Sequence, residues 1–339
     1  MFSAYEMIAA GRYRERFGLP FEQFAVGQRF QHRPGLTLTQ QDNKDEALDT
    51  LNQAMLHYDA AYALTTEWRA PLLVSTLSLQ VLIGMTSKTL GGKRRIVSFE
   101  DIALTRPVFG GDTLYAESEI LATAEEPGAD DVGRLSIITR GGNQRGEEVG
   151  AATYTALVAR ADPGMTAREE RGEARLASHR TIAPNVYREQ TGLDFEDLRP
   201  GETWEHRPGK TFFAEESVRH ALHALEQRGR LTEVRGGRVP VNEVYVMGAV
   251  TALTTKTLGK VVANLGWTHV QFPHPVRAGD TVYAESTVLD TRASRSRPGQ
   301  GIVRVATRAF NQDGALVCSY ERRLLVYGKG QAPSARAGS

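Results

Sequence analysis

An internal repeat constrains this 339-residue chain more than any other feature. Blocks of the first half return in the second half in the same order, the first at an offset of 174 positions and three later ones at 168. They are residues 21–35 with 195–209, 88–91 with 256–259, 111–118 with 279–286, and 143–146 with 311–314. Because chance does not order four matched blocks in this way, the chain contains two copies of one fold unit. The second copy is about six residues shorter between its first two blocks.

The length suits two domains, since a typical domain has roughly 100–200 residues. We expect an N-terminal unit over residues 1–160, which carries the active site, and a C-terminal, non-catalytic unit over 193–328. Between them, residues 161–192 are charged and poorly patterned, which predicts a linker. The last residues, 329–339, are expected to be a disordered tail.

Charge and cysteine content exclude several classes of protein. The chain has 41 basic and 40 acidic residues mixed along its length, so it lacks a basic field for nucleic acid. Its one cysteine, Cys318, has no partner for a disulfide or a CxxC motif, which favours a reducing compartment. The sequence has neither an apolar leader nor an apolar run of the roughly 20 residues that cross a bilayer. We therefore expect a soluble, cytoplasmic protein that acts on a small molecule.

The order of elements within a copy predicts an α+β fold. A strand with a Pro-Gly turn is followed by a T-x-x-D pattern at Thr39, which is typical of a helix start, and by a polar helix to about Thr50. Residues 71–85 begin with proline and are apolar almost all round, as in a buried helix. Strand patterns then occupy 96–104, 113–121, 135–141 and 149–159. Each copy is thus expected to be a long apolar helix wrapped by a curved antiparallel sheet.

Two matched segments carry a resemblance to a known family. The segments RPVFGGDT at 106–113 and FPHPVRAGDTV at 272–282 are similar to the R-F-x-x-P-V-x-x-G-D-T-L motif of the MaoC-like (R)-specific enoyl-CoA hydratases, which have the hotdog fold. The tandem arrangement, with the loops at 125–133 and 262–266, most resembles the double-hotdog mesaconyl-CoA hydratases, also called β-methylmalyl-CoA dehydratases. This resemblance implies a hydro-lyase for an enoyl-CoA thioester, without cofactor or metal. A homodimer of two-unit chains is compatible with it.

The same resemblance indicates two catalytic residues. The family motif D-x-N-P-[LIV]-H matches the segment from Asn52 to His57, in which the histidine is kept and the aspartate is replaced by asparagine. An amide does not take a proton from water at neutral pH, so the division of labour must differ from that of the simpler enzymes. We expect His57 to move the proton during a syn addition and Asn52 to hold the water or the thioester.

Further residues are candidates for substrate binding. The amides around Val74 and Ser75 are predicted to lie at the N-terminus of the apolar helix, where free N–H groups stabilise a developing oxyanion. Asp42 is either an assisting carboxylate or only a helix cap. A dicarboxylic acyl group would need an arginine, for which Arg69 and Arg106 are candidates.

The second copy is expected to be catalytically silent. Its equivalent of the histidine segment, 226–233, contains no histidine, and Glu243 falls near the position of Val74 or Ser75, where it would repel an oxyanion. His220 and His223 lack partners at metal-ligand spacing, so we interpret them as structural.

Three functions remain open from the sequence. The first is hydration and dehydration of a short, branched or dicarboxylic enoyl-CoA such as mesaconyl-CoA. The second is a dehydratase of a CoA-bound or carrier-protein-bound intermediate in specialised metabolism. The third is a non-catalytic acyl-CoA-binding protein, which the replacement of aspartate by Asn52 favours. Thioesterase activity is disfavoured because it requires a carboxylate at that position.

Overall fold

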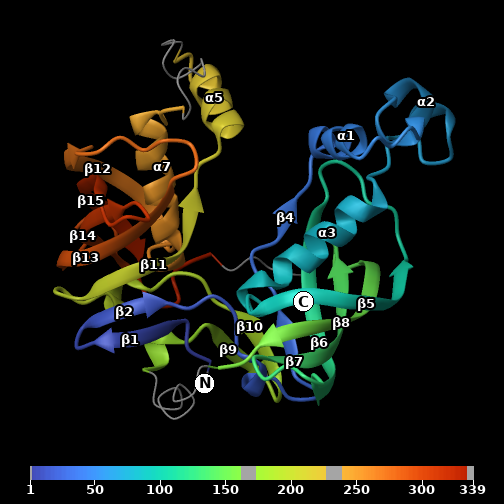
Figure 1. Cartoon of the computed structure of the whole chain (residues 1–339), viewed down its shortest axis with the longest axis horizontal. Coiled ribbons are helices and arrows are strands. Elements are labelled where there is room, and N and C mark those ends of the chain that lie inside the picture. The colour runs from blue at the N-terminus through green and yellow to red at the C-terminus, as the bar shows by residue number, and fades with distance from the viewer. Residues whose placement is uncertain (1, 162–172, 227–238, 334–339) are drawn as a thin grey trace.

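The computed structural model of the chain describes residues 2–161, 173–226 and 239–333. It contains two α+β units of the same design, each with one apolar helix packed on an antiparallel sheet (Figure 1). The predicted tandem hotdog architecture is therefore confirmed. Among the described residues, no helix is both long and apolar enough to span a bilayer.

The first unit follows the predicted order of elements. Its parts are β3 (Arg29–Gln31), β4 (Leu36–Thr37), α1 (Gln40–Asp49), the 3₁₀ helix η2 (Met55–His57), α2 (Ala60–Thr65), α3 (Ser75–Met85), the 3₁₀ helix η3 (Thr86–Lys88), β5 (Lys93–Leu104), β6 (Thr113–Glu125), β7 (Val132–Gly142) and β8 (Glu148–Ala159). The long strands pair antiparallel in the order β5-β8-β7-β6, and β3 continues the sheet beyond β6. Alternate residues of β6, β7 and β8 are buried, as the period-two patterns predicted.

The central helix α3 begins at Ser75, four residues after the proline that was expected to open it. The preceding residues are held in an extended conformation because Leu72 forms a β-bridge with Phe109 and the Leu73 N–H donates to the Val108 carbonyl. Leu82 packs against the sheet at Gly141, where a Cβ atom would lie 2.5 Å from the leucine side chain. This close approach fixes the helix against β7. The Leu72 N–H donates to the carbonyl oxygen of Leu56, which places the segment before α3 beside η2.

The second unit repeats this arrangement. It comprises β11 (Thr203–Thr211), α5 (Ala214–His223), α7 (Glu243–Leu253), the 3₁₀ helix η6 (Thr254–Lys256), β12 (Val261–Gln271), β13 (Thr281–Ala293), β14 (Gln300–Phe310) and β15 (Leu316–Tyr327). The strands pair in the order β11-β13-β14-β15-β12. Residues 329–333 of the expected tail are described, and 334–339 lie outside the described residues.

Two β hairpins are exchanged between the units. The N-terminal hairpin, β1 (Tyr5–Ala9) and β2 (Arg12–Glu15), pairs with β11 of the second unit through parallel β2. The segment expected to be a linker is described from residue 173 and contains a second hairpin, β9 (His179–Ala183) and β10 (Val186–Glu189). This hairpin pairs with β3 of the first unit. Each unit therefore completes its sheet with the hairpin that precedes the other unit.

Equivalent buried carboxylates hold the two hairpins in place. Glu189 accepts hydrogen bonds from Thr89 Oγ1 at 2.6 Å and from the Arg33 N–H at 2.8 Å, and lies 2.9 Å from Nδ1 of the fully buried His32. Burial raises the pKa of Glu189, but these hydrogen bonds outweigh burial and leave the pKa below its usual value. In the second unit, Glu15 makes the same contacts with Thr257, Arg207 N and His206. The repeated histidine and threonine thus anchor the exchanged hairpin in each unit.

The outer strands β5 and β12 form free edges of the two sheets in the described part of the chain. Both are long strands with large apolar side chains that are exposed to solvent. These side chains are Val97, Phe99, Ile102 and Leu104 on β5, and Leu265, Trp267 and Val270 on β12.

Candidate active site

His57 lies at the end of η2, beside the extended segment that leads into α3. Its side chain is half-buried, and its Nδ1 lies 2.7 Å from the carbonyl oxygen of Leu72. A carbonyl oxygen only accepts hydrogen bonds, so Nδ1 must carry the proton of the neutral ring. The lone pair then resides on Nε2, which forms no hydrogen bond with the described residues. In the neutral ring, Nε2 is therefore the basic nitrogen of His57.

Asn52 lies five residues before His57, in the turn between α1 and η2. Its Oδ1 accepts a hydrogen bond of 2.9 Å from the Ala54 N–H, and its side chain is half-buried. No hydrogen bond joins Asn52 to His57, although both belong to the described residues. The Asn52 amide thus shapes the turn between α1 and η2.

Asp42 forms the capping box of helix α1 together with the N-cap residue Thr39. Its carboxylate accepts hydrogen bonds of 2.7 Å from the N–H and the hydroxyl of Thr39, and the Asp42 N–H donates to Thr39 Oγ1. The Thr39 hydroxyl and N–H also lower the pKa of this exposed carboxyl group. Of the two roles that the sequence left open, the geometry shows the capping box.

The unbonded N–H groups of the first turn of α3 begin one residue after the first predicted oxyanion donor. The Val74 N–H is buried and donates to Asn43 Oδ1 at 2.7 Å, so it is not available to a substrate. The next two N–H groups, of Ser75 and Thr76, have no acceptor among the described residues, and both residues are exposed. The prediction is therefore corrected at Val74. The donors that remain are Ser75 and Thr76 at the positive end of the helix.

Two residues of the site were not indicated by the sequence. Gln40 and Asn43, on the face of α1 that packs on η2, donate to the His57 carbonyl oxygen at 2.6 and 2.7 Å. Asn43 is fully buried. These amides fix the main chain of the histidine against α1.

An apolar pocket of about 260 Å³ opens beside this constellation. Its wall is formed by the first two turns of α3, the end of β5, the loop that follows it, and the start of β8. Leu72 connects the pocket with the histidine, because its carbonyl group holds Nδ1 and the residue itself lines the pocket. Ser75 and Arg106 also line it. Arg69 instead donates to the Leu64 carbonyl oxygen and is exposed.

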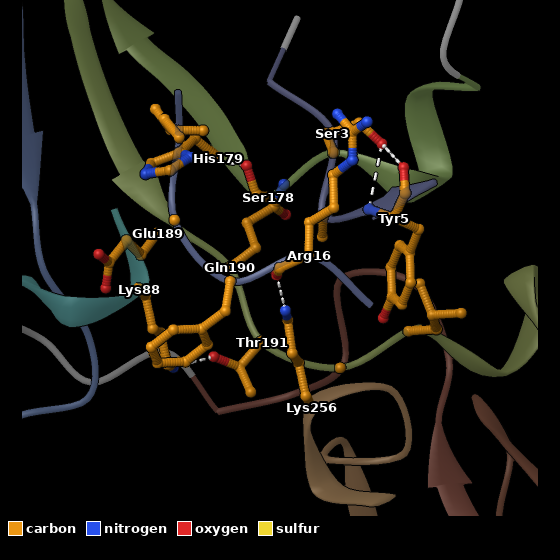
Figure 2. Close-up of a pocket in the computed structure, with 17 residues that line it drawn as sticks. Ser3, Tyr5, Arg16, Lys88, Ser178, His179, Glu189, Gln190, Thr191 and Lys256 are labelled. Atoms are coloured by element: carbon orange, nitrogen blue, oxygen red, sulfur yellow. Dashed lines mark hydrogen bonds between the residues drawn. The ribbon is translucent and has the colours of Figure 1, made fainter. Parts of the chain in front are cut away.

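A second pocket lies at the junction of the two units, between the exchanged hairpins (Figure 2). Lys88 donates to Thr191 Oγ1 and Lys256 to the Arg16 carbonyl oxygen at this junction. Burial lowers the pKa of both lysines, that of Lys256 to about 8. With a volume of about 40 Å³, this pocket is several times smaller than the apolar pocket at α3. We therefore assign the candidate site to the pocket at α3.

The second unit lacks the constellation in its described part. Glu243 occupies the position of Ser75 at the start of α7, as the sequence predicted, and Asn242 caps that helix through the N–H groups of Val244 and Tyr245. His220 stacks on Tyr245 with ring centroids 3.7 Å apart. Of the segment equivalent to Asn52–His57, residues 227–233 lie outside the described residues.

Comparison with known proteins identifies the family. The sequence profile described as mesaconyl-CoA hydratase matches residues 5–185 and again residues 177–335. The chain belongs to the mesaconyl-CoA hydratase family. A mesaconyl-CoA hydratase of Cereibacter sphaeroides is 36% identical over 153 residues, which are 43% of this chain and 44% of that protein. The chain thus aligns with less than half the length of that relative.

A more distant member of the family aligns over more of the chain. A mesaconyl-CoA hydratase of Haloarcula marismortui is 24% identical over 323 residues and covers 90% of both chains. Among solved structures, a Mycobacterium tuberculosis protein described as a double hotdog fold is 17% identical, with a TM-score of 0.38. That match covers 94% of this chain and all of the other.

Proposed function

We propose that the chain hydrates α,β-unsaturated acyl-CoA thioesters, and dehydrates the products, at one site in its first unit. The observation that carries the proposal is the bond between His57 Nδ1 and the Leu72 carbonyl oxygen, which leaves Nε2 as the base. Leu72, whose carbonyl oxygen holds Nδ1 of His57, lines the apolar pocket together with Ser75. Family membership over both units supports the same reaction.

The chemistry follows from these groups. Nε2 of His57 takes a proton from water while the water oxygen bonds to C3 of the enoyl group. The Leu72 carbonyl oxygen stabilises the imidazolium that forms, because it accepts the Nδ1 proton. Negative charge develops on the thioester oxygen, which the N–H groups of Ser75 and Thr76 stabilise. The imidazolium then returns the proton to C2, and the sum is the addition of one water molecule across the double bond.

The pocket suits a short acyl group. Its lining is mainly apolar, and Arg106 is its one cationic residue among the described residues. The Arg106 guanidinium lies 3.7 Å from a Glu147 carboxylate oxygen and is half exposed, so it is free to turn toward a second carboxylate. We propose a short branched or dicarboxylic acyl-CoA, with mesaconyl-CoA as the first candidate.

The test follows the absorbance of the enoyl thioester with mesaconyl-CoA and crotonyl-CoA. We expect His57→Ala to reduce turnover by about 10²–10⁴-fold, the usual contribution of a general base. The control His220→Ala changes a histidine outside the site and should retain wild-type rates. Arg106→Leu should raise KM for mesaconyl-CoA and leave KM for crotonyl-CoA unchanged. Equal activity of the two histidine variants contradicts the assignment.

A wild-type protein that binds both thioesters without turning them over would instead favour the acyl-CoA-binding alternative, which Asn52 in place of aspartate supports. Turnover only of a carrier-protein thioester would favour a dehydratase of specialised metabolism.

We also propose that two chains form a homodimer through the free edges of their sheets. Long, exposed apolar edge strands such as β5 and β12 are templates for pairing with another chain. Phe99→Lys together with Trp267→Lys should convert a dimer into a monomer in sedimentation experiments, and a wild-type monomer would contradict the proposal. A CoA thioester substrate and the buried, unpaired Cys318 are compatible with a cytoplasmic location, which we propose as well.

A further inference from the structure

Asn43 occupies an unusual place for a polar side chain. It lies on α1, and its exposed fraction is 0%. Burying an amide is unfavourable unless its donors and acceptor find partners. The partners of Asn43 therefore indicate what this side chain is for.

All of the polar atoms of Asn43 are engaged. Nδ2 donates to the His57 carbonyl oxygen at 2.7 Å and to the Leu72 carbonyl oxygen at 3.1 Å, and also lies 3.2 Å from Gln40 Oε1. Oδ1 accepts the Val74 N–H at 2.7 Å. One amide thus joins the main chain of η2 to both ends of the three-residue segment before α3.

The Leu72 carbonyl group is shared between two side chains. It accepts from Asn43 Nδ2 and lies against His57 Nδ1 at 2.7 Å. A carbonyl group held by Asn43 presents its oxygen to the imidazole in one orientation. At the same time, Asn43 consumes the Val74 N–H, so that the free donors of α3 are those of Ser75 and Thr76.

We propose that Asn43 is a positioning residue, which holds His57 in its Nδ1–H form and sets the start of α3 relative to Nε2. The catalytic consequence rests on the hydratase function proposed above. Only an amide supplies the donor and the acceptor that the two carbonyl groups and the Val74 N–H require. Aspartate would place an acceptor against two carbonyl oxygens. Leucine would leave the Val74 N–H without its acceptor and would remove one donor from each of the two carbonyl groups.

The second unit offers an internal comparison. Ser217 stands at the position of Asn43, but its hydroxyl donates to the Phe213 carbonyl oxygen within its own helix. Asn242, at the position of Val74, caps α7 by itself. A purely architectural bridge would be needed in both units. The bridge is present in the unit that contains the histidine, which fits a role in positioning that histidine.

The first test needs no variant. In protein labelled with ¹⁵N-histidine, NMR shifts report which ring nitrogen carries the proton, and His57→Ala identifies the signals of His57. We expect the Nδ1–H form in the wild type. In Asn43→Leu and Asn43→Ser, the signals should move toward a mixture with the Nε2–H form, whereas the control Ser217→Ala should leave them unchanged. A wild-type His57 in the Nε2–H form would overturn the proposal.

The second test uses kinetics. Asn43→Ser should reduce kcat about 100-fold with little change in KM, the cost expected when reacting groups are misplaced by about 1 Å. Asn43→Asp, which has nearly the same shape, should move the acid limb of the rate profile to higher pH, because a carboxylate beside His57 favours its protonated form. Unchanged kcat and pH profile in folded variants would overturn the proposal. If the wild type hydrates no enoyl-CoA but the tautomer still depends on Asn43, the proposed function fails and the positioning role stands.

Discussion

At the scale of single residues, the first turn of α3 offers a test that separates a main-chain N–H from a side chain. Ser75 is the first residue of the helix, a position that tolerates proline, and Val74 before it has an extended ψ of 124°. Ser75→Pro removes the N–H and preserves the helix, so we expect kcat to fall about 10²–10³-fold, as for loss of one oxyanion donor. Ser75→Ala keeps the N–H and should remain close to wild type. Steady-state hydration rates measure the difference.

The second unit supplies the matched control for this prediction. Glu243 begins α7 at the equivalent position, and Glu243→Pro should change neither kcat nor KM. If Ser75→Pro retains full activity while its melting temperature is unchanged, the thioester oxygen does not bind at this helix end.

The residues that the sequence predicted are those whose signal is local. The Thr39–Asp42 capping pattern involves neighbours within one turn, and the structure forms this capping box. The spacing of Asn52 and His57 is local as well, and their catalytic roles stay predictions. Asn43 could not be found in this way, because its partners lie 14, 29 and 31 positions away along the chain. The error at Val74 has the same origin, since its N–H is consumed by that distant side chain.

At the scale of elements, the four long strands and the apolar helix of each unit follow from periodicity, but the exchange of hairpins does not. Pairing partners of β2 and β10 depend on the path of the chain between the units. A signal was nevertheless present, because residues 8–15 and 182–189 share Ile-Ala and Tyr-Arg-Glu at the same offset of 174 positions as the first repeat block. The repeat therefore begins at the hairpin, and the hairpin of each repeat pairs with the sheet of the other unit.

This exchange predicts a pair of equivalent stability defects. Glu189→Ala removes the acceptor of Thr89, Arg33 N and His32 in a buried site, which should lower the free energy of unfolding by about 3 kcal/mol. Glu15→Ala should act likewise in the second unit. Urea unfolding measures both losses, and amide hydrogen exchange should rise at 179–189 in the first variant and at 5–15 in the second. If exchange instead becomes faster equally in both hairpins in each variant, the prediction that Glu189 and Glu15 each hold one hairpin is contradicted.

At the scale of the whole molecule, several ionisable groups are buried at the junction between the units. Burial disfavours their charged forms. Lys88 and Lys256 are equivalent residues of the two repeats, and each has its pKa lowered mainly by burial. His179, on the exchanged hairpin, lies 2.9 Å from Thr89 Oγ1 of the first unit. Protonation at this junction therefore acts on the contact between the two units.

The stability of the molecule should consequently depend on pH through His179. Burial, together with His32 and Lys88, lowers the pKa of His179 from 6.5 to about 4, and Glu189 only partly opposes this. Because the unfolded chain binds the proton more readily, stability is full above pH 6.5 and falls as the pH drops toward 4, by up to about 3 kcal/mol. Urea unfolding between pH 7 and pH 4 should show this loss, and His179→Gln should flatten it. His223→Gln, which changes an exposed histidine, should retain the wild-type slope; a slope unchanged in His179→Gln would assign the pH dependence to other groups.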